Sequence, residues 1–417
     1  MTDDRGGDFR RQGGWLPTQD ELERWIEGRR DSLPEHGDRE LRPSVRAFAD
    51  IVDHDPVLRM LAVRMIDEVP PSKPYRKQHV GSFDELVRLV DDVVRSAPAF
   101  GEGSMVSTPL AAVLDWTMAT PSGFAFYRDP RVNRAMGAVL DEWREFLDGP
   151  GSLEVLHDGP DGWMSPEARR VVGIDDFEHD PDAEHWGFSS WNDFFTRAFR
   201  PGARPVEAPD DDDVVTSACE STPYRIARDV QRHDEFWIKS QPYSLEDMLA
   251  HDDSVEQFVG GTVYQAFLSA TNYHRWHSPV RGTVRRAFVQ SGTYFSEADS
   301  EGSAARQPPE SQGYLAHVAA RAIVVIDADN PALGTVGFVA VGMIDVSSCV
   351  IRDGLEGMHV DKGEELGEFR FGGSTHCLVF EPGAVDAFDV DAIPAGSSSS
   401  LVRLGRRIAT ARHDRHE

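Results

Sequence analysis

The second half of the sequence consists of short apolar runs of strand length, and this pattern constrains the fold most. Gly and Pro punctuate the region beyond Val214, as they do between strands joined by tight turns. Strands that alternate with longer helical segments would instead predict βαβ units. We therefore expect a compact β-rich domain. Its clearest runs are Thr262–Leu268, Gly282–Val289, Ala322–Asp327, Val336–Val341 and Leu378–Phe380.

Residues 1–150 instead carry apolar side chains at helical spacing. Ser82 is placed as a helix cap would be, before Leu86, Leu89 and the apolar residues after them. A further helical period runs from Val132 to Leu147. Residues 151–188 are rich in Gly, Pro and Asp, as a linker is. The sequence predicts an α+β protein: a helical accessory domain at 1–150, a linker at 151–188 and a β-rich domain at 189–417.

The charge of the chain excludes some partners. The sequence has 43 Lys+Arg against 71 Asp+Glu, which gives a formal net charge of −28. Phosphate contacts need clustered Arg and Lys, so we expect no nucleic-acid partner. The same argument speaks, more weakly, against adhesion to an anionic membrane.

The start of the chain, the lengths of its apolar runs and its cysteines indicate the cellular compartment of the protein. The first ten residues carry acids where a secretory signal would be basic and then apolar, and the longest apolar runs are too short to span a bilayer. Cys219, Cys349 and Cys377 are far apart and form no CxxC motif, which argues against a disulfide framework or a cysteine zinc site. We expect a soluble, cytoplasmic protein.

Familiar cofactor motifs are missing from the sequence. It contains no GxGxxG, P-loop, HExxH or GxSxG pattern. Its four lysines include none in a setting typical of a pyridoxal Schiff base. The chemistry must therefore be sought in other segments.

One such segment is Asn272–Pro279, which carries His274 and His277. Imidazoles three residues apart can transfer protons near neutral pH. They are also potential metal ligands, but no third ligand with suitable spacing stands nearby, so we expect no metal site. A purely structural or solvent-facing role is an equal alternative.

The other segment is Phe371-Gly-Gly-Ser-Thr-His376. Two glycines free the backbone just before Ser374 and a strand-like run, so a hairpin turn is the simplest interpretation. The sharper interpretation is self-cleavage. The Ser374 hydroxyl would attack the Gly373 carbonyl, and elimination and hydrolysis would leave a pyruvoyl group, a ketone that serves as an electron sink. His376 would either assist or simply pack on the strand.

These segments resemble the phosphatidylserine decarboxylase family of pyruvoyl enzymes. The resemblance covers roughly residues 189 to 385. Gly14–Pro17, Leu22 and Trp25 further resemble the extra N-terminal domain of soluble, L-tryptophan-decarboxylase-like members. The matching catalytic-domain motifs stand in the family's order: Trp191–Arg197, Tyr273–His277, Lys362–Gly367 and Gly373–Thr375.

The resemblance implies a covalent pyruvoyl group made from Ser374. Cleavage between Gly373 and Ser374 would give chains 1–373 and 374–417, which stay associated, and a homodimer is plausible for the family. By position, His277 matches the histidine of self-processing and His274 the one that protonates the decarboxylated intermediate. The family's Ala-Asp-Gly is replaced here by Ala218-Cys-Glu-Ser221, so Glu220 substitutes for the aspartate only if the alignment shifts by one position.

The function that follows is a carboxy-lyase acting on a soluble aromatic L-amino acid such as tryptophan, which it converts to the amine. A phosphatidylserine decarboxylase that makes phosphatidylethanolamine is the alternative within the family. Two alternatives are not enzymes: an uncleaved, non-catalytic member of the family, and a carrier-like binding module. A carrier needs a modifiable lysine at a hairpin tip, usually beside methionine, whereas Lys362 follows Asp361 and precedes Gly363.

Overall fold

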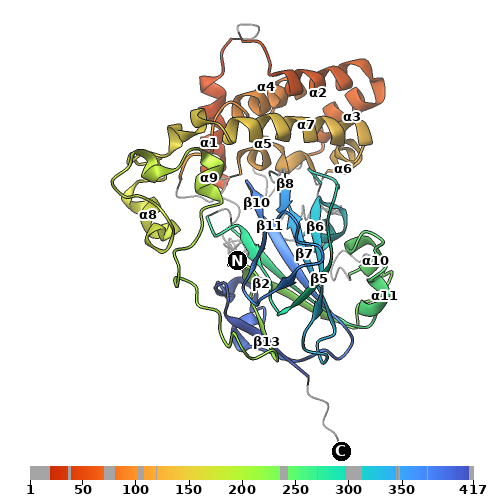
Figure 1. Ribbon diagram of the computed structural model, residues 1–417. Coiled ribbons are helices and arrows are strands. Elements are labelled where there is room, and N and C mark those ends of the chain that lie inside the picture. The colour runs from red at the N-terminus through yellow and green to blue at the C-terminus, as the bar shows by residue number, and fades with distance from the viewer. Residues whose placement is uncertain are drawn as a thin grey trace, which may run out of the picture.

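The molecule is a group of helices followed by a β-rich region of antiparallel sheets (Figure 1). The predicted α+β class is therefore confirmed. Gly14–Pro17 and Gly373 lie outside the described residues. The computed structural model describes residues 19–35, 39–69, 80–101, 108–118, 120–234, 243–269, 271–296, 312–343, 345, 348–372 and 374–412.

The N-terminal helices begin where the sequence places caps and prolines. The Ser82 side chain accepts a hydrogen bond from Glu85 N at the start of α4, and Asp129 caps α7 in the same way. Proline occupies the first turn of α2, α3, α6 and α7. The helices predicted after Ser82 and from Val132 are confirmed. In chain order the helices are α1 (Gln19–Ser32), α2 (Pro43–His54), α3 (Pro56–Asp67), α4 (Phe83–Val93), α5 (Pro109–Met118), α6 (Pro121–Tyr127) and α7 (Pro130–Leu147).

Residues 151–188, expected to be a linker, are instead packed against the helices. Trp163 and Trp186 are almost fully buried, the Trp163 indole N–H donates to Pro98 O at 2.7 Å, and the rings of Trp163 and Trp191 lie 4.9 Å apart. The Gly, Pro and Asp content of the segment favoured a linker, but its tryptophans each bury a large apolar area and hold it against the rest of the protein. The short elements here are η2 (Pro150–Val155), α8 (Pro166–Val172), η3 (Ile174–Asp176), η4 (Glu184–Gly187) and α9 (Trp191–Phe195).

The β-rich region contains a seven-stranded sheet in the order β2-β3-β11-β7-β6-β5-β9 and two three-stranded sheets, β4-β10-β8 and β1-β13-β12. The strands are β1 (Val214–Thr216), β2 (Thr222–Arg228), β3 (Thr262–Leu268), β4 (Arg275–His277), β5 (Gly282–Gln290), β6 (Arg321–Ala328), β7 (Thr335–Gly342), β8 (Ser348–Ile351), β9 (His359–Val360), β10 (Glu365–Arg370), β11 (Ser374–Phe380), β12 (Val385–Phe388) and β13 (Arg407–Ala411). Short helices accompany them: α10 (Leu245–Met248), α11 (Val255–Phe258), α12 (Gln312–Val318), η6 (Val390–Ala392) and η7 (Gly396–Ser398).

Both faces of the seven-stranded sheet are buried. On β11, His376 and Leu378 point to the face covered by the smaller sheets, whereas Thr375 and Cys377 point to the other face. That second face shares one continuous apolar cluster with the N-terminal helices. The helical region and the β-rich region therefore pack as one body across the predicted linker.

The structure also bears on the cysteines and the membrane. Cys219, Cys349 and Cys377 are buried free thiols. Within the described ranges, no helix combines the length and the apolar character needed to cross a bilayer.

Asp345, in the connection after β7, joins the two regions. Its carboxylate accepts hydrogen bonds from Leu110 N at 3.1 Å and Ala111 N at 2.8 Å, and so caps α5. In Figure 1, α5 and α7 lie across the end of the sheets where β8, β10 and β11 are labelled. Burial raises the pKa of Asp345 to about 7, against the effect of the two N–H donors.

This raised pKa makes the stability of the folded chain depend on pH. Between about pH 4 and pH 7 the carboxyl is protonated when folded and ionised when unfolded, so its contribution to stability falls as pH rises. Asp345→Asn does not titrate. We expect the free energy of unfolding of the wild type, relative to this variant, to fall by roughly 1 kcal/mol per pH unit between pH 5 and pH 7. Urea unfolding of both proteins measures this, and parallel pH profiles would contradict it.

Candidate active site

The turn between β10 and β11 is strained. Phe371 has φ 26° and Gly372 has φ 122°. Positive φ is unfavourable for a residue with a side chain, and a φ of 122° favours glycine. Strained backbone of this kind persists only where the surrounding structure holds it in place.

Aromatic rings from two elements, α7 and α9, hold this turn. The Phe371 ring lies 5.1 Å from Trp143, 5.8 Å from Trp191 and 5.2 Å from Phe195, all at steep interplanar angles. Edge-to-face pairs at these separations are favourable. Trp143 belongs to α7, so the helical region directly contacts the turn. The periodicity of α7 places Trp143 on its apolar face but does not show what it touches.

Ser374 is the first residue of β11, directly after the turn. In the sheet it lies between Leu268 of β3 and Gly342 of β7. Its side chain is fully buried, and its Oγ has no hydrogen-bond partner among the residues that the structure describes. A buried hydroxyl without a partner costs free energy, so the hydroxyl is free for chemistry rather than used for stability.

His274 is a buried, neutral imidazole. Its ring stacks on Phe195 with 4.0 Å between the centroids, and apart from the Asn272 backbone no described residue makes a hydrogen bond to either ring nitrogen. Burial, with a smaller effect from the charge of Arg197, lowers the pKa of His274 to about 3. Through Phe195 the ring belongs to the same aromatic group that holds Phe371.

His277 has a defined tautomer. Its Nδ1 lies 2.9 Å from Gly363 O, and its Nε2 lies 2.9 Å from the Tyr273 hydroxyl. Burial lowers the pKa of His277 to about 4, so the ring is neutral at pH 7. Since a carbonyl oxygen only accepts, Nδ1 carries the proton and the Tyr273 hydroxyl donates to Nε2.

Both histidines lie beside β10, the strand that leads into the turn. Phe369 N donates to His274 O at 2.9 Å, whereas His277 pairs with Glu365. Ser374 follows Phe369 by five residues and Glu365 by nine. The backbone therefore brings His274 nearer to the turn than His277. No described residue, and so neither histidine, makes a hydrogen bond to the Ser374 hydroxyl.

Glu220, the candidate substitute for the family's aspartate, makes no hydrogen bond or ion pair with His277. Its carboxylate is held by Arg204, whose Nε is bound to Oε1 and whose Nη2 lies 3.4 Å from Oε2, and Leu404 N adds a 3.4 Å contact. Both side chains of this ion pair are largely buried. The neighbouring Ala218 O accepts from His277 N at 2.9 Å, so this segment touches the backbone of His277.

Lys362 and the metal-ligating side chains bear on two other kinds of site. Lys362, on which a carrier module would depend, is buried, and its Nζ donates to Ala208 O at 3.0 Å and Asp211 O at 2.6 Å. A lysine held in this way is not a modifiable hairpin tip, so the structure argues against a carrier. Within the described residues, no three His, Cys, Asp or Glu side chains gather as metal ligands would.

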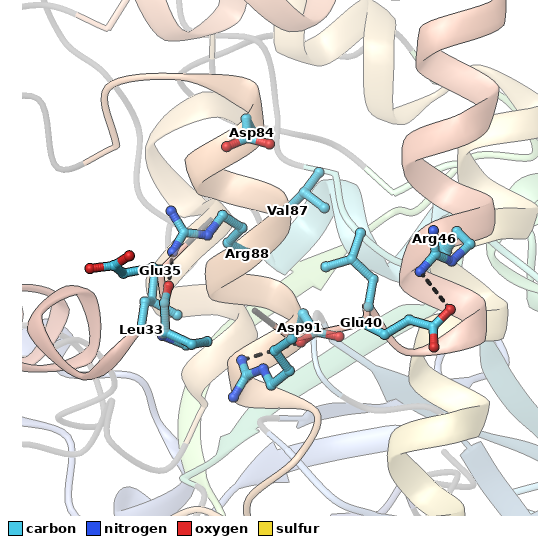
Figure 2. Close-up of a pocket in the computed structure, with 11 residues that line it drawn as sticks. Leu33, Glu35, Glu40, Arg46, Asp84, Val87, Arg88 and Asp91 are labelled. Atoms are coloured by element: carbon cyan, nitrogen blue, oxygen red, sulfur yellow. Dashed lines mark hydrogen bonds and ion pairs between the residues drawn. The ribbon is translucent and has the colours of Figure 1, made fainter. Parts of the chain in front are cut away.

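A cavity of about 360 Å³ lies in the helical region, away from Ser374 in the chain (Figure 2). Several of its charged groups are paired locally, for example Arg46 with Glu40 at 3.1 Å and Arg39 with Asp91 at 3.2 Å. None of the site residues described above lines it. The lining consists of Leu33, Pro34, Glu35, Arg39, Glu40, Leu41, Arg46, Asp84, Val87, Arg88 and Asp91.

Comparison with known proteins gives the family. A family model described as phosphatidylserine decarboxylase matches residues 191–410, and a second, also described as a phosphatidylserine decarboxylase, matches residues 42–172. The decarboxylase iboD of Amanita muscaria is 44% identical over 305 residues, which cover 68% of this chain and 87% of the relative. The L-tryptophan decarboxylase of Psilocybe cubensis is 32% identical over 364 residues, covering 81% and 80%.

Another relative matches a shorter part of the chain. Phosphatidylserine decarboxylase proenzyme 3 of Schizosaccharomyces pombe is 34% identical over 226 residues, which cover 53% of this chain and 22% of the relative. The first family model by itself spans more than half of the 417 residues. The chain therefore belongs to the phosphatidylserine decarboxylase family and is a carboxy-lyase.

Proposed function

We propose that the protein cleaves itself between Gly373 and Ser374 and then decarboxylates a soluble amino acid. The observation that carries this proposal is the buried, unpartnered Ser374 hydroxyl, placed directly after a strained turn in a decarboxylase chain. Several relatives are named proenzymes, which supports processing here too.

The surroundings of Ser374 fit a pyruvoyl group made from that residue. The group would stay bound in β11, between β3 and β7, with the rings of Phe195 and His274 near the turn. When present, it would supply a ketone that accepts the substrate amine and withdraws electrons during loss of carbon dioxide. The protein supplies position, a dry environment and proton transfer around it.

His277, in β4, and His274, just before β4, have different roles in the proposed mechanism. His277 is neutral with its Nε2 lone pair turned toward Tyr273, and it would serve self-processing. His274, nearer to the turn, would hold the proton delivered to the substrate carbon, since a substrate carboxylate nearby would favour the charged imidazole. Glu220 with Arg204 would act indirectly, by fixing the backbone that binds His277 N.

These roles predict opposite outcomes for two alanine variants. His277→Ala is expected to accumulate the uncleaved precursor. His274→Ala is expected to be cleaved normally and to lose at least 100-fold in kcat, the size typical of a lost proton donor. Electrophoresis under denaturing conditions and a carbon dioxide assay measure the two steps separately. Cleaved, inactive His277→Ala protein would contradict this division of roles.

A soluble aromatic L-amino acid such as tryptophan is the substrate that we infer. The relative named L-tryptophan decarboxylase aligns over both the helical and the β-rich regions, whereas the S. pombe phosphatidylserine decarboxylase aligns over about half of the chain. The net charge of −28 also disfavours an anionic lipid surface. Phosphatidylserine is the second candidate, favoured by the family description itself.

One experiment tests cleavage and another tests the substrate. Intact-mass spectrometry should find chains 1–373 and 374–417, the smaller one blocked by pyruvoyl at its first residue. A full-length chain alone would overturn the proposal and favour a non-catalytic member.

Purified protein given L-tryptophan should release tryptamine. Phosphatidylethanolamine formed from phosphatidylserine vesicles, without tryptamine, would reverse the choice of substrate. Cytoplasmic location, association of the two chains and a homodimer stay predictions.

A further inference from the structure

Arg197, just after α9, is a buried cation without an acidic partner. It is 4% exposed, and its Cζ lies 4.3 Å from the ring centre of Phe177 and 5.1 Å from that of Phe194. Glu220, the acid whose charge reaches it, is bound to Arg204 instead. Burial lowers the pKa of Arg197 to about 10, so it is still charged at pH 7. A buried charge of this kind costs free energy, and packing alone does not explain it.

The guanidinium of Arg197 binds the backbone directly before His274. Its Nη2 donates to Thr271 O at 3.2 Å and lies 3.5 Å from Asn272 O. The Asn272 backbone also bonds the His274 ring, and this bond favours the charged imidazole. A ring N–H therefore donates to that carbonyl. The Asn272 carbonyl thus lies between the guanidinium and the imidazole, and Arg197 holds the group that orients the ring.

The charge of Arg197 also acts on His274. Burial is the larger cause of the low pKa of His274, and the cation of Arg197 lowers it further. On the elements packed against His274, the other titratable or charged groups near it are Tyr273, Arg275, His277, Glu365 and Glu368. Tyr273 and His277 are neutral at pH 7, and Arg275 lies 2.8 Å from Glu365 and 3.6 Å from Glu368. None of these five contributes to the shift in the pKa of His274.

We propose that Arg197 is the positioning residue of His274: it holds the carbonyl that orients the imidazole, and its charge makes the protonated ring release its proton more readily. This inference rests on the proposed function. When the substrate has lost carbon dioxide, the electron pair of the broken bond forms a new C–H bond with the ring proton. The imidazole is left neutral, and no oxidant or reductant is needed. Arg197 acts through His274 and need not touch the substrate.

Two variants of Arg197 test this inference in the full chain. Arg197→Met removes both the donors and the charge. It should cleave itself as the wild type does, because self-processing uses His277, and should lose roughly tenfold or more in kcat with little change in KM. Arg197→Lys keeps the charge and a donor, so it should regain part of the lost kcat. Denaturing electrophoresis and a carbon dioxide assay measure the two steps.

The pH dependence separates this role from a purely structural one. The alkaline limb of the kcat profile reports the proton donor in the substrate complex. Without the cation, His274 keeps its proton to higher pH, so the limb of Arg197→Met should move up by about 0.5 pH unit or more. Arg197→Lys should keep the wild-type limb. The ring-nitrogen NMR signals of His274, assigned by their loss in His274→Ala, should shift in Arg197→Met without any substrate.

Arg321→Met is the matched control, because Arg321 is also a buried arginine that holds carbonyls, Met248 O at 2.9 Å and Ala319 O at 2.8 Å. It should lose stability and keep the wild-type limb. If Arg197→Met does not fold, Arg197→Gln carries the pH test, since it keeps donors without the charge.

Two results would overturn the assignment. One is a folded Arg197→Met variant with the kcat and limb of the wild type. The other is self-cleavage slowed as much as kcat with the limb unmoved, which would show a structural role alone. The proposed function fails separately, because it requires the wild-type chain to be cleaved and to release carbon dioxide.

Discussion

Ser374→Ala is expected to leave a single chain of 417 residues with no measurable decarboxylation. The hydroxyl is the proposed nucleophile of self-cleavage and the precursor of the ketone, so both activities depend on one oxygen atom. Folding should be preserved, because the hydroxyl has no hydrogen-bond partner among the described residues and its loss breaks no bond. Intact mass and a carbon dioxide assay measure the two effects.

Thr375→Val is the matched control for this variant. Thr375 also carries a hydroxyl, but it donates to Ala266 O at 2.9 Å and accepts from Gln265 Nε2 at 3.2 Å, on the opposite face of β11. We expect this variant to be cleaved and active, at some cost in stability. Decarboxylation by uncleaved Ser374→Ala protein would mean that the reaction does not use a group made from residue 374.

Trp143→Ala is expected to slow self-cleavage at least tenfold although Trp143 lies far from Ser374 in the sequence. Its ring packs edge-on against Phe371 at 5.1 Å, and its indole N–H is anchored to Ser96 O at 3.0 Å. Without that ring, the Phe371 backbone can relax from its positive φ to a more favourable conformation. The strain of about 1–3 kcal/mol is then lost, and the turn no longer holds the geometry that cleavage needs. The fraction of cleaved chain over time after synthesis measures the effect.

Two further variants separate positioning from general damage. Trp143→Phe keeps an aromatic edge against Phe371 and should restore most of the cleavage rate. Trp116→Ala removes a buried indole elsewhere in the helical region, where its N–H bonds to Ala112 O at 3.3 Å. This variant should lose stability but keep cleavage. Equal slowing by both alanine variants would show that only the stability of the helices matters.

Local patterns predicted the elements well. Ser82 and Asp129 start helices because their side chains satisfy free N–H groups within the next turn, an interaction that is complete within a few residues. The runs Thr262–Leu268 and Ala322–Asp327 form strands for a similar reason, since alternation and β-branched residues act locally. The Gly-rich approach to Ser374 is likewise visible in the sequence.

Contacts between distant segments could not be predicted in this way. Nothing near Glu220 shows that Arg204 holds its carboxylate, and nothing near Trp143 shows that it meets Phe371. Each pair depends on the whole chain being folded. The packed segment 151–188 was missed because its composition is typical of loops, while Trp163 and Trp186 decide its burial.

The position of β11 within the sheet bears on whether folding or the proposed cleavage comes first. Every residue of β11 is paired with β3 on one side and with β7 on the other, so the smaller product of the proposed cleavage would fill the interior of a sheet. Made separately, the larger piece would expose two open strand edges, which invite aggregation. If the chain is cleaved as proposed, folding must therefore come before cleavage. The cleaved protein would then keep a fold that its separated pieces would not readily regain, and its lifetime would be set by how slowly it unfolds.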